Sequence, residues 1–591
     1  MRKSLTYKIL AAVLAAGSLG LYAAAPAAAD DYTVKKDGEI ISSGTFTNVY
    51  GNGHSFTITG GRINGDVYGV GDESYTGDAS GGNVTISGGT ISSAGGSTDV
   101  YGGYSESGEA HHNTVNISGD AKVTGYVYGG YSVSGGSAND NEIIISGSAD
   151  IENANLYGGY KDTDTGNTLT INGWSGSTNS VHNFNDIAFK NISWKNNGSI
   201  LTITNQNGYT SDLANTEINI NSIAGGSSIK AGDKMTLIAS NTNLSDEVKY
   251  NINDTFTAGV AREGLGSTIV NTNGEVSFKV NSIKLSSQAV SVAQTRAASA
   301  AFVNQGTDLI SDSLDTISRD DNYGVKTFAA VHGNRSKYDV ADDIKINGWS
   351  TIVGVGNADK FDNGSEFSWG IFYENGSGNY RTYNSFNNEF FRGDGSMVYN
   401  GGGIAARYEN KNGVYTEGSL RAGMLKNELD NAMRDVNGSY GYETESAYYG
   451  AHIGVGKIIS LSDSSDLDVY GKFFHTYTEG DSVTIAGDKF DFDSITSDRL
   501  RIGARITSNK ENKFSTYYGL AYEYEFNGDA DMSAQGLRAD TQSLQGSSVM
   551  AEVGFNYQPT PDSPWSFDLN MRGYTGERQG GSFNVQATYT F

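Results

Sequence analysis

The last eleven residues of the chain, GSFNVQATYTF, alternate between apolar and polar side chains. Phe583, Val585, Ala587, Tyr589 and Phe591 are apolar, and the residues between them are polar. Because successive side chains of a β-strand point to opposite faces, this period of two places all five apolar residues on one face. The pattern predicts a strand with one oily face that continues to Phe591.

The same alternation recurs over residues 323–591, with charged side chains on the polar face. About twelve strands are expected, beginning near residues 325, 347, 366, 397, 413, 444, 465, 495, 513, 547, 565 and 581. Runs of about 10 to 14 residues suit strands that cross a membrane at a tilt, with apolar residues toward lipid and polar residues toward the lumen. The charged residues expected to face the lumen are Glu417, Arg421, Arg501, Arg505, Glu523, Glu525 and Arg572.

The connections between these strands alternate in length from the third strand on. Long connections are expected at 380–396, 427–443, 479–494 and 527–546, with short turns between the other strands. Outer-membrane barrels have short periplasmic turns and longer outer loops. The pattern therefore predicts a 12-stranded transmembrane β-barrel with both of its ends on the periplasmic side.

Residues 30–221 contain a repeated motif rich in Gly and Tyr. Its copies lie about 27 to 33 residues apart from Tyr68 onward, and a second motif, such as Asn113 to Gly119, lies between them. A fixed period in this range indicates stacked units that are too small to bury an apolar face alone. We expect a right-handed parallel β-helix, and the alternative is a Gly-rich disordered tract. The repeat residues are Tyr68, Gly69, Tyr101, Gly102, Tyr128, Gly129, Tyr157 and Gly158.

The tyrosines of this motif allow two interpretations. An exposed row of tyrosines would offer flat, amphipathic contact area to a binding partner. Alternatively, the rings stack internally or occupy turns, and this is the interpretation we favour.

Residues 222–285 still alternate as strands, and the pattern then changes to a helical one. The segment 286–322 is rich in Ala, and its small side chains would let a helix fill a narrow channel. A linker helix on the surface is the alternative. The apolar residues recur at steps of seven, four and three, which is the spacing of one helix face, and they are Val303, Ile310, Leu314 and Ile317.

Residues 1–29 have the features of a secretory signal peptide. A positive start precedes an apolar stretch, and small residues suit cleavage by signal peptidase between Ala29 and Asp30. A membrane anchor is the alternative, but the apolar run is short. We therefore expect the chain to leave the cytoplasm through the Sec translocon.

Composition narrows the classes of protein further. The chain of 591 residues has no cysteine, so the exported part is not held together by disulfides, although its compartment would allow them. Its 78 glycines and 36 tyrosines favour β-structure with many tight turns. A formal charge of -26 argues against a nucleic-acid partner, which requires basic patches.

A signal peptide, β-helical repeats, a helix and a terminal barrel, in this order, resemble the classical monomeric autotransporters of type V secretion. The most specific parts are the helix AASAAFVNQGTDLISDSL and the terminus FNVQATYTF. The resemblance implies that the terminal strand is the signal read by the barrel-assembly machinery. It implies that the passenger threads outward and folds outside, beginning at a barrel-proximal cap over 222–285.

The resemblance also bears on whether the passenger is released. Some autotransporters cut themselves between two asparagines in the linker helix. The nearest match here is Asn304 followed by Gln305, which departs from that pattern. We therefore expect the passenger to stay attached.

The passenger shows no familiar catalytic motif. It contains no Gly-Asp-Ser-Gly, no Gly-x-Ser-x-Gly elbow and no His-Glu-x-x-His zinc site. We expect no catalytic, cofactor-binding or metal-binding residues and a monomeric chain in outer-membrane lipid. The leading hypothesis is a displayed passenger for adhesion or self-association, with a host or bacterial surface ligand. The alternatives are a passenger with an unmarked enzymatic or immune-modulating activity, and a plain porin with a soluble extension.

Overall fold

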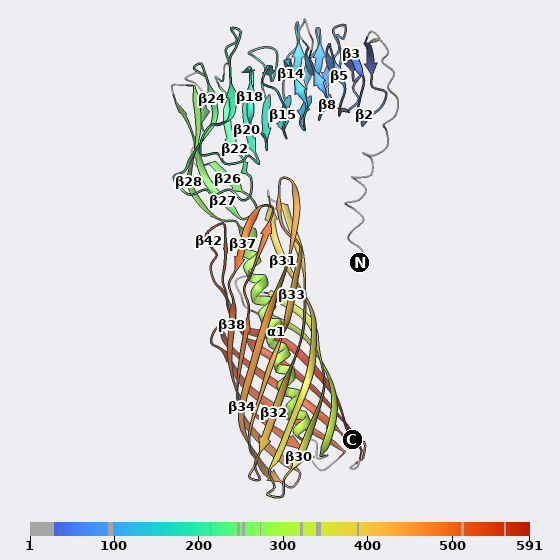
Figure 1. The fold of residues 1–591 in the computed structure, drawn as a ribbon, viewed down its shortest axis with the longest axis vertical. Coiled ribbons are helices and arrows are strands. Elements are labelled where there is room, and N and C mark those ends of the chain that lie inside the picture. Colours follow the sequence, from blue (N-terminus) through green and yellow to red (C-terminus); the bar gives the residue numbers. More distant parts are fainter. Residues whose placement is uncertain are drawn as a thin grey trace, which may run out of the picture.

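The computed structural model describes residues 29–92, 98–211, 213, 215–244, 249–250, 254–271, 274–319, 323–338, 344–386, 389–509, 513–560 and 563–591. The expected signal peptide lies outside the described residues, apart from Ala29. From its amino end the chain forms a stack of short strands, one long helix and a closed barrel (Figure 1). The stack lies across one end of the barrel, and the helix runs inside the barrel.

Two mainly parallel sheets run along the stack, because the coils of the chain contribute short strands to both. The first contains β1 (Asp30–Thr33), β3 (Thr45–Tyr50), β5 (Arg62–Ile63), β6 (Val67–Val70), β9 (Thr90–Ile91), β10 (Val100–Ser105), β13 (Lys122–Val123), β14 (Gly125–Ser132), β16 (Ala154–Tyr157) and β19 (Ser180–His182). The second contains β2 (Glu39–Ile41), β4 (Phe56–Ile58), β8 (Asn83–Ile86), β12 (Thr114–Ile117), β15 (Glu142–Ser146), β17 (Thr168–Asn172), β20 (Asp186–Lys190), β22 (Glu217–Ile220) and β25 (Lys249–Tyr250). A small separate sheet pairs β7 (Ala79–Ser80) with β11 (Ala110–His111).

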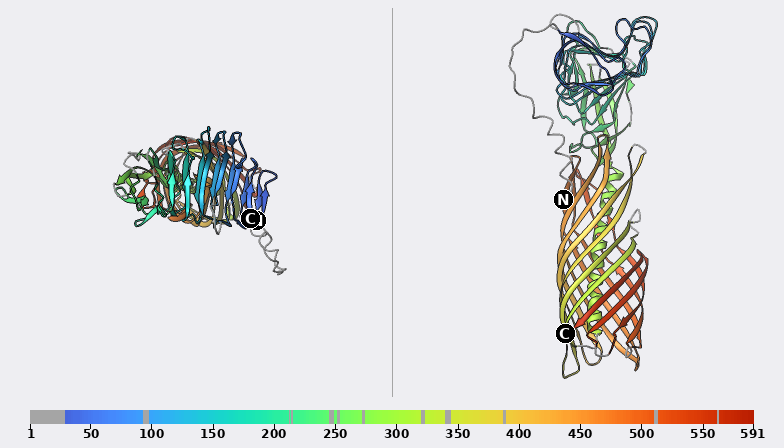
Figure 2. Two further views of the ribbon diagram at one scale, coloured as in Figure 1. Left: turned by 90° about the horizontal axis from the view of Figure 1, so that it is seen from above. Right: turned by 90° about the vertical axis from the view of Figure 1, so that its right-hand side faces the viewer.

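The interior of the stack is filled by aliphatic side chains that repeat from coil to coil. Val67, Val100, Val127, Leu156 and Val181 are successive register partners in the first sheet, and all are fully buried. One coil alone would leave this face in water, and stacking covers it. The right-hand view of Figure 2 looks along the stack and shows the backbone of successive coils superimposed.

The stack changes its pairing next to the barrel. A seven-stranded sheet contains β18 (Gly176–Thr178), β21 (Ser199–Ile203), β24 (Lys234–Ser240), β28 (Glu275–Leu285), β27 (Arg262–Asn271), β26 (Asp254–Ala258) and β23 (Ser222–Ile223), in this order. Pairing is antiparallel from β24 through β28 and β27 to β26. Strand β28 leads directly into helix α1 (Ser287–Arg319).

Twelve antiparallel strands close into the barrel, and the last strand pairs with the first. They are β29 (Gly324–Tyr338), β30 (Ile344–Lys360), β31 (Glu366–Phe386), β32 (Glu389–Glu409), β33 (Val414–Asp435), β34 (Gly438–Ser462), β35 (Ser465–Thr478), β38 (Ile495–Ser508), β39 (Phe514–Glu525), β44 (Gly546–Tyr557), β45 (Trp565–Gly576) and β46 (Arg578–Thr590). Closure removes the free sheet edges that an open sheet would expose. The predicted fold class is confirmed: an all-β chain with a stacked parallel passenger, one linker helix and a 12-stranded barrel.

The barrel lumen is filled by α1 along its length (Figure 1). The helix has 33 residues, so it is about 50 Å long at 1.5 Å per residue. Within the described residues, no helix is both long enough and apolar enough to span a membrane.

The four predicted long connections contain strands, which corrects the sequence-based expectation. The segments 380–396 and 427–443 continue the hairpins β31–β32 and β33–β34, so the starts expected near 397 and 444 are wrong. The other two segments contain β36 (Asp481–Ile485), β37 (Asp488–Phe492), β40 (Asp529–Ala530), β41 (Met532–Ala534), β42 (Leu537–Arg538) and β43 (Gln542–Ser543).

In these hairpins the strands continue beyond the point where the apolar alternation ends. The outward side chains become polar there, whereas the inward side chains still pack against the helix. Tyr380, Leu425, Leu429 and Met433 are buried in one cluster with the first half of α1. We call these tall hairpins, together with the segments 479–494 and 527–546, the collar. The collar surrounds the helix between the passenger and the shorter part of the barrel (Figure 1).

Candidate functional site in the barrel lumen

Helix α1 carries three carboxylates on one face. Asp308, Asp312 and Asp315 follow one another at steps of four and three residues, which places them on neighbouring turns of that face. All three are buried. A buried charge is costly unless it is paired and hydrogen-bonded, so their positions depend on the cations of the barrel wall.

Asp308 is held by three guanidinium groups. Its Oδ1 accepts hydrogen bonds from Arg499 Nη1 at 3.2 Å and from Arg501 Nη2 at 2.8 Å. Its Oδ2 accepts one from Arg578 Nη1 at 3.0 Å. These arginines come from β38 and β46, so this carboxylate joins the helix to two separate parts of the wall.

The next two carboxylates extend this contact along the helix. Arg572 donates two parallel hydrogen bonds to Asp312, of 2.7 and 2.6 Å, in the bidentate geometry that is among the strongest for this pair. Asp315 lies 3.1 Å from both Arg407 Nη1 and Lys472 Nζ, and 3.4 Å from Arg505 Nη1. The helix is therefore bound by ion pairs over about two turns.

Carboxylates of the wall share the same cations. Glu523 Oε2 lies 2.7 Å from Arg501, and Glu552 Oε1 lies 2.6 Å from Arg505. Glu417 Oε1 lies 2.7 Å from the Lys472 ammonium. The cations of the wall are thus held by wall carboxylates as well as by the carboxylates of the helix.

The side of the helix away from the three carboxylates packs against the barrel wall through apolar side chains. The ring of Phe302 lies against Gly348 and Gly378, and a Cβ at Gly348 would stand 2.6 Å from that ring. Farther along, Ile310 of the helix is buried in one cluster with Phe328 and other apolar wall residues. A side chain at position 348 would force the Phe302 ring or the neighbouring strand at Ser377 to shift.

The carboxyl end of α1 is capped by a buried lysine. Lys326 Nζ donates a hydrogen bond of 3.0 Å to the carbonyl oxygen of Ile317. A cation at this end also complements the helix dipole. The first strand of the barrel thereby fixes the end of the helix that precedes it.

The structure places all seven predicted lumen residues in the lumen, where they are buried. Arg421 donates to the carbonyl oxygen of Val303 and to Thr307 Oγ1, and Arg501, Arg505 and Arg572 bind the helix carboxylates. Glu417 and Glu523 pair with wall cations, whereas Glu525 accepts a hydrogen bond of 2.7 Å from Ser497. Alternation also placed Arg499 on this face, whereas sequence reasoning missed Asp308, Asp312, Asp315, Arg407, Lys472, Glu552 and Arg578. The spacing of the three helix carboxylates was the available signal.

Asn304 lies beside the acidic wall of the lumen. Its Nδ2 donates a hydrogen bond of 2.8 Å to Ser497 Oγ, which in turn donates to Glu525. Arg499 Nη2 also donates to the backbone carbonyl of Asn304. The peptide bond that follows is therefore part of an intact, tightly bonded helix, and attachment of the passenger stays a prediction.

A second contact joins the passenger to the collar. Asp488 begins β37, is fully buried, and accepts hydrogen bonds from three passenger amides. Gly226 N donates to its Oδ1 at 2.8 Å, and Val260 N and Ala261 N donate to its Oδ2 at 2.9 Å each. The buried Arg262 guanidinium lies 3.8 Å away, and burial lowers the pKa of Arg262.

The repeat tyrosines form two interlocking rows outside the aliphatic core. Tyr68, Tyr101 and Tyr128 stack on one another with ring centroids 5.1 and 5.3 Å apart and nearly parallel planes. Tyr104 and Tyr131 form a second row that meets the first edge-on. Burial raises the pKa of the three first-row tyrosines, and it raises that of Tyr157 to about 12. The ring faces are thus occupied by neighbouring rings.

The repeat glycines make room for a ladder of asparagines. A Cβ at Gly102, Gly129 or Gly158 would approach the Cβ of Asn113, Asn141 or Asn167 to 3.0 Å or less. Asn113 donates through Nδ2 to Asn141 Oδ1 at 3.0 Å, and Asn141 donates likewise to Asn167 at 3.1 Å. Gly69 instead faces Val84 and the backbone of the next coil.

The two ends of the described chain hold the remaining predicted residues. Asp30 begins β1, directly after Ala29. Val585 and Ala587 of β46 pair with Val331 and Ala329 of β29 across the closing seam. The five apolar residues of the terminal segment point outward, away from the lumen, and they are Phe583, Val585, Ala587, Tyr589 and Phe591.

An apolar outer band, a charged lumen and a closed antiparallel barrel define an outer-membrane β-barrel, here filled by a helix that leads to an outer domain. The family model described as "Autotransporter beta-domain" matches residues 327–571. No curated protein sequence matches the chain.

Several solved structures are similar to the barrel. The translocator domain of autotransporter NalP from Neisseria meningitidis is 15% identical, covers 52% of this chain and 100% of its own, and has a TM-score of 0.39. The β-domain of the Bordetella autotransporter BrkA is 13% identical, covers 45% and 100%, and has a TM-score of 0.36. The transport unit of AIDA-I from Escherichia coli is 11% identical, covers 46% and 91%, and has a TM-score of 0.36.

The chain carries an autotransporter β-domain, which the family model places at residues 327–571. Its barrel lies in the outer membrane, and its passenger lies on the cell surface.

Proposed function

We propose that this autotransporter keeps its passenger attached and displays it for adhesion or self-association. The observation that carries the proposal is the double attachment of the passenger. Asp308, Asp312 and Asp315 hold the linker helix in the lumen, and Asp488 holds the passenger base on the collar. A passenger fixed in this way is oriented for contact with another surface.

The regular rows along the passenger support a binding role. Chemically equivalent groups recur from coil to coil, at about the 4.8 Å spacing of neighbouring strands. Because the tyrosine faces are stacked, a ligand meets ring edges and hydroxyl groups, as at the exposed Tyr160. Such a surface suits multivalent polar contact with a repetitive ligand on a host or bacterial cell.

Self-association would use the flanks of the stack in preference to its first strand. Among the described residues, β1 has β3 as its partner strand, and its sequence begins Asp30, Asp31. Short, charged edge strands resist pairing with another chain. The partly exposed Tyr131 and Tyr157 and the exposed Tyr160 offer an alternative surface on the flank.

We also propose that the passenger is not an enzyme and that export uses the Sec translocon, signal peptidase and the barrel-assembly machinery. The repetition of the same types of side chain in successive coils supports the proposal that the passenger is not an enzyme. The outward apolar face of β46 supports the role of the barrel-assembly machinery, because it would present a terminal strand to that machinery.

The test uses the full chain on intact diderm cells. Protease added outside should remove residues before about 285 and leave a protected fragment of about 286–591.

Cells displaying the chain should aggregate or adhere. The double substitution Tyr131→Ser with Tyr160→Ser should reduce aggregation and adhesion when the two proteins are displayed at equal levels. The exposed Ile40→Ser serves as the matched control. Protection of the passenger on intact cells would contradict surface display, and unchanged adhesion of the tyrosine variant would contradict the binding role.

A further inference from the structure

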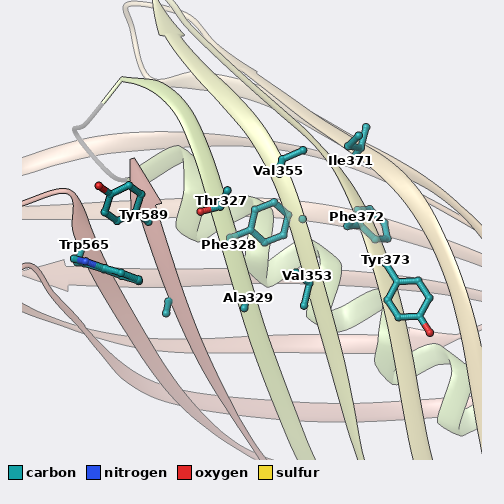
Figure 3. Close-up of a pocket in the computed structure, with 12 residues that line it drawn as sticks. Thr327, Phe328, Ala329, Val353, Val355, Ile371, Phe372, Tyr373, Trp565 and Tyr589 are labelled. Carbon is teal, nitrogen blue, oxygen red and sulfur yellow. The ribbon is translucent and has the colours of Figure 1, made fainter. Parts of the chain in front are cut away.

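A shallow apolar groove lies on the outer surface of the barrel where the last strand meets the first. Its volume is about 640 Å³, and Figure 3 shows the side chains that line it. Thr327, Ala329 and Ala587 form its floor, and Ala329 is the register partner of both Ala587 on β46 and Val353 on β30. The groove exists because small residues meet at these register positions.

Large side chains form the two walls of the groove. Trp565 and Tyr589 stand on one side, with ring centroids 5.0 Å apart in an edge-to-face contact. Val353, Val355 and Ile371 stand on the other side and are exposed. The polar atoms lining the groove are few, so water would find little there to bind.

The position of the groove determines which lipid it meets. Trp565 is the first residue of β45, and Val355 lies near the tight turn at Phe361–Gly364 that joins β30 to β31. This end of the barrel is opposite the passenger, which is on the cell surface (Figure 1). The groove therefore lies in the half of the bilayer nearest the periplasm, which is the phospholipid leaflet. Trp and Tyr are enriched at such membrane–water boundaries, where their polar tips reach the headgroups.

We propose that this groove binds one acyl chain of an inner-leaflet phospholipid. The groove is continuous with the lipid-facing band of the barrel, so hydrocarbon is the medium that fills it. A flexible acyl chain matches a depression between rigid strands and covers the closing seam between β46 and β29. The indole N–H of Trp565 and the hydroxyl of Tyr589 would donate hydrogen bonds near the headgroup.

A bound acyl chain would also stabilise the part of the barrel wall that contacts the linker helix. Phe328 and Phe372 line the groove from the strands beneath it, and both are buried in a cluster with Leu309 and Ile310 of α1. The wall is thin here because Gly354 has no side chain and the Phe328 ring lies against it. The lipid outside and the helix inside thus contact the same three strands.

The experiment measures retained lipid on the full chain purified from outer membranes in mild detergent. Native mass spectrometry should show about one tightly held phospholipid on the wild type. Ala329→Phe fills the floor and should reduce that retained fraction at least several-fold. Ala504→Phe is the matched control, because Ala504 faces lipid on β38 at a similar distance from the periplasmic turns. Equal retention by all three proteins would overturn the proposal.

Photolabelling of the wild type tests the site without any substitution. A phospholipid with a photoreactive group in its acyl chain is incorporated into the membrane, and labelled peptides are counted. Label concentrated on peptides containing 327–329, 353–355 and 565 supports the groove. Label spread evenly around the lipid-facing band would mean ordinary annular lipid, and the proposal would be wrong even if Ala329→Phe failed to fold.

Discussion

At the scale of single residues, the position of the linker helix depends most on Asp308. This fully buried carboxylate receives three arginines, from both β38 and β46. Replacing it leaves those guanidinium groups buried with fewer compensating charges. Removing one partner of a buried ion pair is far more costly than the net contribution of the pair itself.

We predict that Asp308→Asn loosens the helix in the lumen. The loss should be about 3–5 kcal/mol, the range for breaking a buried pair, and should appear as higher ion conductance in planar bilayers and a lower unfolding temperature. Asp394→Asn is the control, because Asp394 pairs with Arg392 on the exposed surface at 2.8 Å, where pairs contribute about 0–1 kcal/mol. Equal conductance of the two variants would show that the carboxylate does not hold the helix.

Asp488 sets the second attachment, between the collar and the passenger. Asp488→Ala removes the acceptor of three amide hydrogen bonds, and each buried donor left without a partner costs about 1–3 kcal/mol. We predict faster hydrogen exchange at Gly226, Val260 and Ala261, with little change in the barrel. Asp491→Ala on the same strand is the control, because Asp491 is half exposed and paired with Lys489. Unchanged exchange at the three amides would remove Asp488 from this role.

At the scale of elements, the tyrosine rows couple passenger stability to alkaline pH. Burial raises the pKa of Tyr68, Tyr101 and Tyr128 in the folded state, whereas an unfolded tyrosine ionises near pH 10. Above about pH 10 the unfolded chain therefore binds fewer protons than the folded chain. The stabilising contribution is complete below that pH and is lost as the pH rises through the window up to the folded pKa.

We predict that phenolate absorbance of these rows appears together with loss of β-sheet circular dichroism. Tyr101→Phe keeps the ring but removes one titrating group, so it should shift the alkaline transition upward. Tyr75→Phe is the control, since Tyr75 is exposed. Ionisation of all tyrosines near pH 10 with the β-sheet signal intact would contradict the burial of the rows.

Element boundaries also show what the sequence could and could not predict. The starts of β35 at Ser465 and of β38 at Ile495 match the expected positions, because the two-residue alternation extends to these ends of both strands. The starts of β32 and β34 were missed because their first residues lie in the collar, where the outward face is polar.

The charged lumen face was predictable from alternation, but the pairing of Asp308 with Arg578 joins residues 270 positions apart. No local pattern encodes that contact.

At the scale of the whole molecule, the passenger is fixed at one end. Its first coils, such as β1 and β3, are held by their neighbours in the stack. The barrel-proximal part adds antiparallel pairing of β26, β27 and β28 and the contact with Asp488. In a stacked array, stability is roughly a sum of unit and neighbour terms, so units with extra neighbours are the last to open.

We therefore predict a gradient of stability along the passenger. Hydrogen exchange on the full chain should be fastest in β1 to β5 and slowest in β26 to β28, with exchange in the coils between increasing with distance from the barrel. Local opening free energies range from near zero at fraying ends up to the global value. Asp488→Ala should speed hydrogen exchange in the strands nearest the barrel and so reduce the difference in exchange along the passenger, whereas Asp491→Ala should leave that difference unchanged. Uniform protection along the passenger would mean that it opens as a single cooperative unit, and the barrel would then serve as its anchor without setting the order in which its coils open.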